Sequence, residues 1–96
     1  MLNKIYGWLK ADEEAGKICS VTRWSENEIH VIGGKDDINY EIAESENKCI
    51  VKAEHFCGYC LKTFETAVEA YKYVLNTTFA ELANDETYAE GWEEEI

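Results

Sequence analysis

The sequence has 96 residues, enough for one small domain but not for two independent hydrophobic cores. Its hydrophobic fraction of 46% predicts a folded chain. No stretch approaches the run of about 18 apolar residues that a transmembrane helix needs, and the N-terminus lacks the apolar core of a signal peptide. We therefore expect a cytoplasmic protein with no membrane partner.

The charge balance excludes further classes of function. Twenty acidic residues against nine basic ones give a formal net charge of −11. Direct binding to nucleic acid or to anionic membranes is not expected, because proteins neutralise such partners with Lys and Arg. A surface of this charge suits a basic protein partner, although it can also serve solubility alone.

The first predicted element is a helix over residues 2–14. Apolar residues recur at helical spacing from Leu2 to Leu9, and Gly16 is suited to end the helix. The acids of residues 12–14 oppose the helix dipole, and we interpret them as an exposed polar turn.

Three antiparallel strands are expected next, as a meander with short loops. The first lies within residues 17–24, which are rich in β-formers, and the second covers residues 29–32. Gly33-Gly34 then interrupts the chain. Residues 38–42 alternate apolar and polar side chains, which predicts a third strand with one apolar face.

Residues 48–64 admit two interpretations. As a helix, they place Ile50, Cys57 and Phe64 on one face; as strands, residues 49–53 and 59–64 pair with each other. Gly58 weakens the helix. We favour a strand for residues 48–53 and leave the remainder open.

The C-terminal region predicts a helix that is broken near residue 77. Thr66-Ala-Val-Glu69 is a capping box that begins the helix, and Thr78-Phe-Ala-Glu81 is a second one. Residues 84–96 are either a short docked helix or a frayed acidic tail. The helix should pack across the apolar face of the third strand through a stripe formed by Ala67, Val68, Tyr71, Val74, Leu75 and Phe79.

These elements predict a single α+β domain over residues 1–96. It has an N-terminal helix, an antiparallel β-meander of three to four strands and a C-terminal helix.

The cysteines raise the possibility of a metal site. Cys57 and Cys60 form a Cys-x-x-Cys pair, which Cys49 and His55 could complete as a tetrahedral zinc site. A second closely spaced pair of ligands is missing, so we favour buried thiols and expect no cofactor. A dithiol redox role is not expected, because the chain contains no proline and no thioredoxin-like βαβ setting for the motif.

No catalytic signature stands in the sequence, and we expect a protein that is not an enzyme. Only two histidines are present, and His30 lies in a strand, facing solvent or the second face of the sheet. Gly33-Gly34 is not followed by the Lys-Ser/Thr and helix of a phosphate loop.

Acidic residues gather on the predicted turns. Carboxylates held on rigid turns can imitate the phosphates of duplex DNA and pair with Arg and Lys of a nucleic-acid enzyme. The alternative is a solvated polar rim. The acids stand in three segments, namely Asp36-Asp37, Glu44 with Glu46, and Asp85-Glu86.

Residues 40–51, with the pattern Tyr-x-Ile-x-Glu-Ser-Glu-Asn-x-x-Ile-Val, resemble the type II-A anti-CRISPR family of small acidic Cas9 inhibitors from Listeria prophages. The order of elements from residue 29 is also similar. The resemblance implies a helix, a three-stranded antiparallel sheet and following helices. It also implies binding to the guide-loaded nuclease where the protospacer-adjacent motif is read, through the loop of Asp36, with Asn39 and Tyr40 adjoining it. The four cysteines, Gly33-Gly34 and a longer helical region after Val51 depart from that family.

The sequence thus predicts a non-enzymatic acidic inhibitor of phage or mobile-element origin. It would act as a DNA mimic on a basic protein surface, that of a nucleic-acid enzyme such as a Cas nuclease. The alternative is a small zinc-stabilised or generic protein-interaction module. The predicted partner-binding residues are Asp36, Asp37, Asn39, Tyr40, Glu44, Glu46, Asp85 and Glu86.

Overall fold

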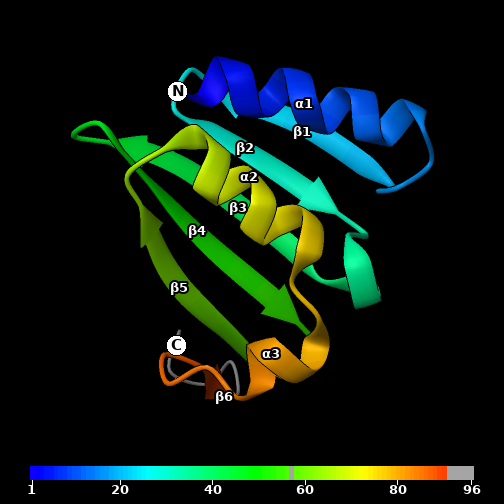
Figure 1. Cartoon of the computed structure of the whole chain (residues 1–96), viewed down its shortest axis with the longest axis vertical. Helices are drawn as coiled ribbons and strands as arrows, with labels where there is room; N and C mark the ends of the chain where they lie inside the picture. Colours follow the sequence, from blue (N-terminus) through cyan, green and yellow to red (C-terminus); the bar gives the residue numbers. More distant parts are fainter. Residues whose placement is uncertain (57, 91–96) are drawn as a thin grey trace.

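Consecutive strands of the chain pair side by side and build one antiparallel sheet in the order β1-β2-β3-β4-β5-β6 (Figure 1). The structure is a computed structural model that describes residues 1–56 and 58–90. Each of the first four connections within the sheet is short, as a meander requires. The strands are β1 Ser20–Ser25, β2 Glu28–Ile32, β3 Asn39–Ser45, β4 Lys48–His55, β5 Gly58–Phe64 and β6 Ala89–Glu90.

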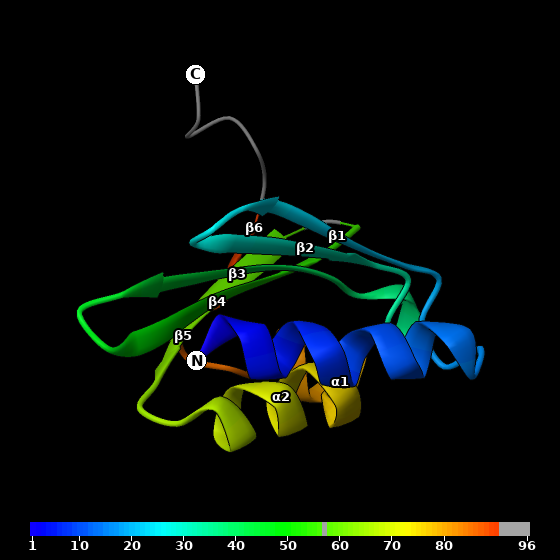
Figure 2. The same cartoon turned by 90° about the horizontal axis from the view of Figure 1, so that it is seen from above.

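Two helices, α1 and α2, lie side by side on one face of the sheet (Figure 2). The opposite face is not covered by any helix of the described chain, and we call it the uncovered face. No described helix is long and apolar enough to cross a membrane. The helices are α1 Leu2–Glu14, the 3-10 turn η1 Lys35–Asp37, α2 Ala67–Asn76 and the short α3 Phe79–Ala83.

The core lies between the helices and the sheet. Alternate residues of each strand point toward the helices, because successive side chains of a strand leave on opposite faces. α1 contributes apolar side chains one helical turn apart, and α2 contributes two small residues that let it approach the sheet closely. Buried members of this core include Leu2, Ile5, Leu9, Val21, Ile29, Val31, Ile42, Val51, Ala70 and Val74.

The predicted α+β class and N-terminal helix are confirmed, and the first three strands pair as expected. The sheet holds more strands than predicted. Residues 48–55 and 58–64 pair as the two strands of a β-hairpin, so the helical interpretation is wrong: Ala53 and Cys60 face each other as a buried cross-strand pair, whereas Leu61 is exposed. β6 adds a further short strand against β5.

The predicted break in the C-terminal helix is confirmed. α2 ends at Asn76, Thr77 is extended, and Thr78 begins α3 with a complete capping box to Glu81. α2 packs on the predicted face of the sheet, but mainly over β4 and β5; its contact with the third strand is the edge contact of the Tyr73 and Tyr40 rings, 6.2 Å between centroids.

The apolar stripe predicted for the C-terminal helix is wrong at Val68 in α2 and at Phe79, which belongs to α3. Val68 and Phe79 are 47% and 39% exposed, whereas Ala70 and Val74 are fully buried. The buried stripe is narrower than the apolar content of the helix suggested: α2 packs over β4 and β5, whereas α1 covers β1 and β2.

Residues 84–90 form a turn followed by β6, so neither a docked helix nor a frayed tail begins at residue 84. Residues 91–96, the rest of the predicted acidic tail, lie outside the described residues.

Candidate functional site

The uncovered face carries the polar half of the alternation in β2 and β3. Ile29 and Val31 are buried beneath the helices, which turns Glu28 and His30 to the opposite face. In β3, Glu41 lies between two buried residues and points to the same face. All three polar side chains are half-buried on the surface of the sheet.

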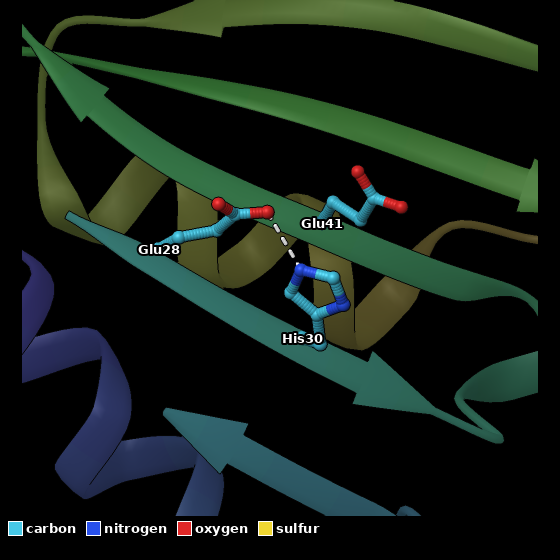
Figure 3. Close-up of side chains that lie close together, drawn as sticks. All are labelled: Glu28, His30 and Glu41. Atoms are coloured by element: carbon cyan, nitrogen blue, oxygen red, sulfur yellow. Dashed lines mark hydrogen bonds and ion pairs between the residues drawn. The ribbon is translucent and has the colours of Figure 1, made fainter. Parts of the chain in front are cut away.

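Strand register brings these three side chains together (Figure 3). His30 pairs directly with Glu41 across β2 and β3, and Glu28 precedes His30 by two residues on the same face. The Oε2 atom of Glu28 lies 2.6 Å from Nε2 of His30. One ligand atom from each of the three residues lies within 4.8 Å of the other two. One imidazole and two carboxylates therefore converge, a group that we call the Glu28–His30–Glu41 cluster.

The imidazole of the cluster is held by an aromatic neighbour. The ring of Trp24, from β1, stacks on that of His30 with 4.4 Å between centroids and 17° between planes. The base nearest in register is Lys52, opposite Glu41 on β4. Its ammonium lies 3.8 Å from Oε2 of Glu54 and 4.9 Å from the ring centroid of Tyr59. Lys52 is thus engaged with other partners.

Of the two acids of η1, one is bonded within the fold and the other faces solvent. Oδ2 of Asp36 accepts a 2.9 Å hydrogen bond from the backbone nitrogen of Phe79, which ties η1 to the first turn of α3. Asp37 is exposed, and its carboxylate makes no hydrogen bond or ion pair with another described residue. Both aspartates have left-handed backbone angles, with φ of 57° and 63°.

The acids around the β3–β4 turn divide in the same way. Oε1 of Glu44 accepts a 3.2 Å hydrogen bond from the backbone nitrogen of Leu2 and lies 3.7 Å from the terminal amine of Met1. It therefore holds the start of α1 against the end of β3. Glu46 is exposed on the turn, at the end of β3 opposite to η1, and its carboxylate contacts no described hydrogen-bonding partner.

The third acidic segment repeats this division. Oδ2 of Asp85 lies 2.7 Å from Nζ of Lys62, and Oδ1 accepts hydrogen bonds from the backbone and hydroxyl of Thr87. The Lys62 ammonium, followed by Thr87, lowers the pKa of Asp85 to about 2. Glu86, the next residue, is exposed. In each predicted segment one carboxylate is therefore bound within the fold (Asp36, Glu44, Asp85), and the other is exposed to solvent (Asp37, Glu46, Glu86).

Two of the predicted partner-binding residues are engaged inside the fold. Tyr40 is 1% exposed in the core, so the expectation that its side chain contacts a partner is wrong for this structure. Tyr40 lies on the face of β3 that packs against the helices, where the strand places its apolar side chains. Oδ1 of Asn39 accepts a 2.8 Å hydrogen bond from the backbone of Gly33 and closes the loop between β2 and β3.

The alternative zinc site from Cys49, His55, Cys57 and Cys60 is not assembled by the described residues. Cys49 and His55 lie at opposite ends of β4, about 20 Å apart at roughly 3.3 Å per residue. Cys60 is buried opposite Ala53, and its sulfur lies 3.3 Å from the Tyr73 hydroxyl. Cys57 lies outside the described residues. One tetrahedral site cannot hold both Cys49 and His55.

A corner next to η1 exposes aromatic side chains. The rings of His55 and Phe79 lie 4.3 Å apart between centroids, and Phe79 is the residue whose backbone binds Asp36. Phe56, which follows His55, is 86% exposed. Exposed aromatic residues are enriched in protein-binding surfaces, so this corner is a candidate contact surface.

A polar hollow of about 220 Å³ lies at the start of α1 and is lined by Met1, Leu2, Asn3, Arg23, Glu26 and Glu44. Two of its charged side chains are engaged in the fold: Glu44 binds the start of α1, and the Arg23 guanidinium donates to Asn3 and to two backbone carbonyls. This arrangement explains the hollow as the junction of α1 with the sheet.

His30 lies on the second face of the sheet, one of the two positions that the sequence allowed, but the sequence did not indicate the Glu28–His30–Glu41 cluster. The sequence does contain part of this information: Glu28 and His30 are two residues apart in β2, and residues two apart in a strand share a face. The register that adds Glu41 depends on the loop through η1, which the composition of that loop does not specify.

Neither a family model, nor a curated protein, nor a solved structure matches this chain.

Proposed function

We propose that this protein is a non-enzymatic acidic inhibitor that occupies the basic site of a nucleic-acid enzyme in place of DNA. The observation that carries the proposal is the division of each acidic segment into a structural and an outward carboxylate. The outward ones are those of Asp37, Glu46 and Glu86. Charges displayed on ordered turns bind a partner with less loss of conformational freedom than charges on a flexible tail.

The spacing of the outward acids suits a nucleic-acid site. The whole of β3, 7 residues long, separates Asp37 from Glu46, which corresponds to about 23 Å at roughly 3.3 Å per residue. The uncovered face between them adds the carboxylate of Glu54. A duplex strand carries one phosphate per ~3.4 Å, so the acids cover a length of roughly seven base pairs.

The preferred target is the site at which a guide-loaded Cas9 reads its protospacer-adjacent motif. The support is the resemblance of residues 29–51 to the type II-A anti-CRISPR family. Such a site presents Arg side chains toward the major groove, and carboxylates are their natural competing partners. The exposed Phe56, next to the acidic η1 corner, would supply an apolar anchor. Such an inhibitor would act in the cytoplasm of the host.

The test measures whether the protein displaces duplex DNA carrying the motif from guide-loaded Cas9, over a series of salt concentrations. We expect competition that weakens steeply with salt, because ion pairs dominate the contact. The variant Asp37→Asn/Glu46→Gln/Glu86→Gln should reduce competition at least about tenfold, since several charge-assisted contacts are lost together.

A matched control separates a specific site from bulk charge. The variant Glu14→Gln/Glu65→Gln/Glu69→Gln removes the same charge from exposed positions on or beside the helices. It should compete as the natural protein does. Equal losses in both variants, or competition that is insensitive to salt, would contradict DNA mimicry. If the protein does not bind the nuclease at all, the generic interaction module becomes the better interpretation.

A further inference from the structure

We infer that the Glu28–His30–Glu41 cluster is a binding site for a divalent first-row transition cation, with Zn²⁺ as the reference ion. The site lies on the uncovered face of the sheet and is separate from the outward acids of the three acidic segments. It requires no enzymatic activity and no macromolecular partner.

The geometry of the cluster suits a cation. Three side chains from two neighbouring strands place one nitrogen and two oxygen ligands within 4.8 Å of one another. Small rotations of the two glutamate side chains would bring these atoms to the ligand distances of about 2.0–2.2 Å that Zn²⁺ takes with imidazole nitrogen and carboxylate oxygen. The backbone already supplies the convergence through the pairing of His30 with Glu41.

The cluster also has more carboxylates than cationic partners, which favours a bound cation. Two carboxylates face one imidazole, and only Glu28 bonds to it, at 2.6 Å. Glu41 is half-buried but makes no hydrogen bond or ion pair among the described residues. Lys52, its cross-strand neighbour, has its ammonium at Glu54. A bound cation would balance both carboxylates at once.

The ligand set selects the class of ion. Imidazole favours zinc, copper, nickel and iron, whereas Mg²⁺ and Ca²⁺ favour sites made of oxygen alone. Three protein ligands at a solvent-facing position leave at least one coordination position for water or for a donor from another molecule. Trp24 stacks on His30 and so limits rotation of the ligating ring.

The test is a calorimetric titration of Zn²⁺ into the full chain after removal of metals with a chelator. We expect one site per chain, and binding that weakens as the pH falls because protons compete for the ligands. His30→Ala and Glu41→Gln should each weaken binding at least about tenfold, as loss of a direct ligand costs no less than loss of a supporting one. Thermal unfolding without metal verifies that both variants fold.

The chain offers matched controls for each ligand. His55→Ala removes the other histidine, and Glu46→Gln removes an exposed carboxylate just after the end of β3, outside the cluster. Both should bind Zn²⁺ as the natural protein does. Zinc held by thiols would survive His30→Ala, and the Co²⁺ complex would then show a thiolate charge-transfer band. Either result, or the absence of stoichiometric binding, overturns the proposal.

A second readout is independent of affinity. Trp24 contacts the imidazole, so Cu²⁺ or Ni²⁺ at the cluster should quench its fluorescence. Trp24→Phe keeps a stacking ring and should lose that part of the quenching while retaining Zn²⁺ binding. Equal quenching in Trp24→Phe and in the natural protein would place the ion elsewhere and contradict the site.

Discussion

The phenolic hydroxyl of Tyr71 on α2 donates a 2.7 Å hydrogen bond to Oδ2 of Asp12 on α1. Asp12 is 7% exposed, and this bond joins the two helices that cover the sheet. The interpretation of residues 12–14 as an exposed polar turn is therefore wrong for Asp12. Glu13 also serves the fold, because its Oε2 accepts a hydrogen bond from the backbone of Val21 at 3.1 Å.

Tyr71→Phe should lower the free energy of unfolding by about 1–3 kcal/mol, because it leaves the buried Asp12 carboxylate without its hydroxyl donor. Urea unfolding monitored by circular dichroism measures the change. Tyr6→Phe is the matched control, since the Tyr6 hydroxyl makes no hydrogen bond with a described residue and its loss should change stability little. Equal effects of the two variants would refute a special role for the Tyr71–Asp12 bond.

The same bond predicts a response to alkaline pH. The hydrogen bond to Asp12, with burial, raises the pKa of Tyr71 to about 12. A raised pKa stabilises the folded protein below the unfolded pKa of about 10, and the contribution disappears as the pH rises through about 12. The stability difference between the natural protein and Tyr71→Phe should therefore shrink over that interval in unfolding experiments. If the stability difference between the two proteins stayed constant up to pH 12, the raised pKa of Tyr71 would be contradicted.

Asp85 should make the free energy of unfolding depend on pH in the acidic range. Its pKa is lowered to about 2, chiefly by Lys62, so its contribution is complete above the unfolded pKa of about 4 and is lost as the pH falls toward 2. Asp85→Asn should cost up to about 2 kcal/mol at pH 7 and little at pH 2. Urea unfolding across this range measures the difference.

Glu86→Gln provides the control for this pH profile, because it removes the same charge from the neighbouring, exposed residue. Its stability should run parallel to that of the natural protein from pH 7 to pH 2. A constant loss in Asp85→Asn at all pH values would mean that the Lys62 ion pair does not stabilise the fold.

Much of the fold could be predicted because its signals are local. Apolar spacing defined α1 to the residue, and the capping box of Thr78 located the restart of the C-terminal helix. The pairing of β4 with β5 was ambiguous in the sequence because the apolar residues fit both a helix and a pair of strands. The long-range pairing of β4 with β3 decides the outcome, and a local pattern contains no information about that pairing.

The candidate sites could be predicted only in part. Composition identified all three acidic segments, but which carboxylate of each serves the fold depends on contacts over long sequence distances, such as that of Asp36 with Phe79. The Glu28–His30–Glu41 cluster depends on the β2–β3 register. That register is established through η1, where Asp36 and Asp37 adopt left-handed angles that are uncommon for residues other than glycine.

The cysteines should differ sharply in reactivity. Cys19 is exposed, whereas Cys49 and Cys60 are fully buried, and burial raises the pKa of the Cys49 thiol. Because the thiolate is the nucleophile, alkylation of Cys49 and Cys60 should be at least about a hundredfold slower than that of Cys19. Peptide mass spectrometry after timed labelling resolves each site. Labelling of Cys49 at the rate of Cys19 would show that the core opens far more readily than its packing predicts.

The β3–β4 turn allows stability and partner binding to be separated. Glu46 and Asn47 form a two-residue turn closed by the pair Ser45 and Lys48, with φ of 52° and 65°. Positive φ at both positions is the pattern of a type I′ turn, in which Asn-Gly is preferred. Asn47→Gly should therefore raise the free energy of unfolding by about 0.5–1 kcal/mol, because glycine adopts this conformation without strain.

Asn47→Gly keeps the Glu46 carboxylate, so it should compete with DNA as well as the natural protein does. Glu46→Gly relieves the same kind of backbone strain and should also stabilise the fold, by about 1 kcal/mol, but it removes an outward acid. It should therefore unfold at higher urea concentration and yet compete less well. If both variants lost competition, the turn geometry would matter rather than the charge. If neither did, Glu46 would not belong to the binding surface.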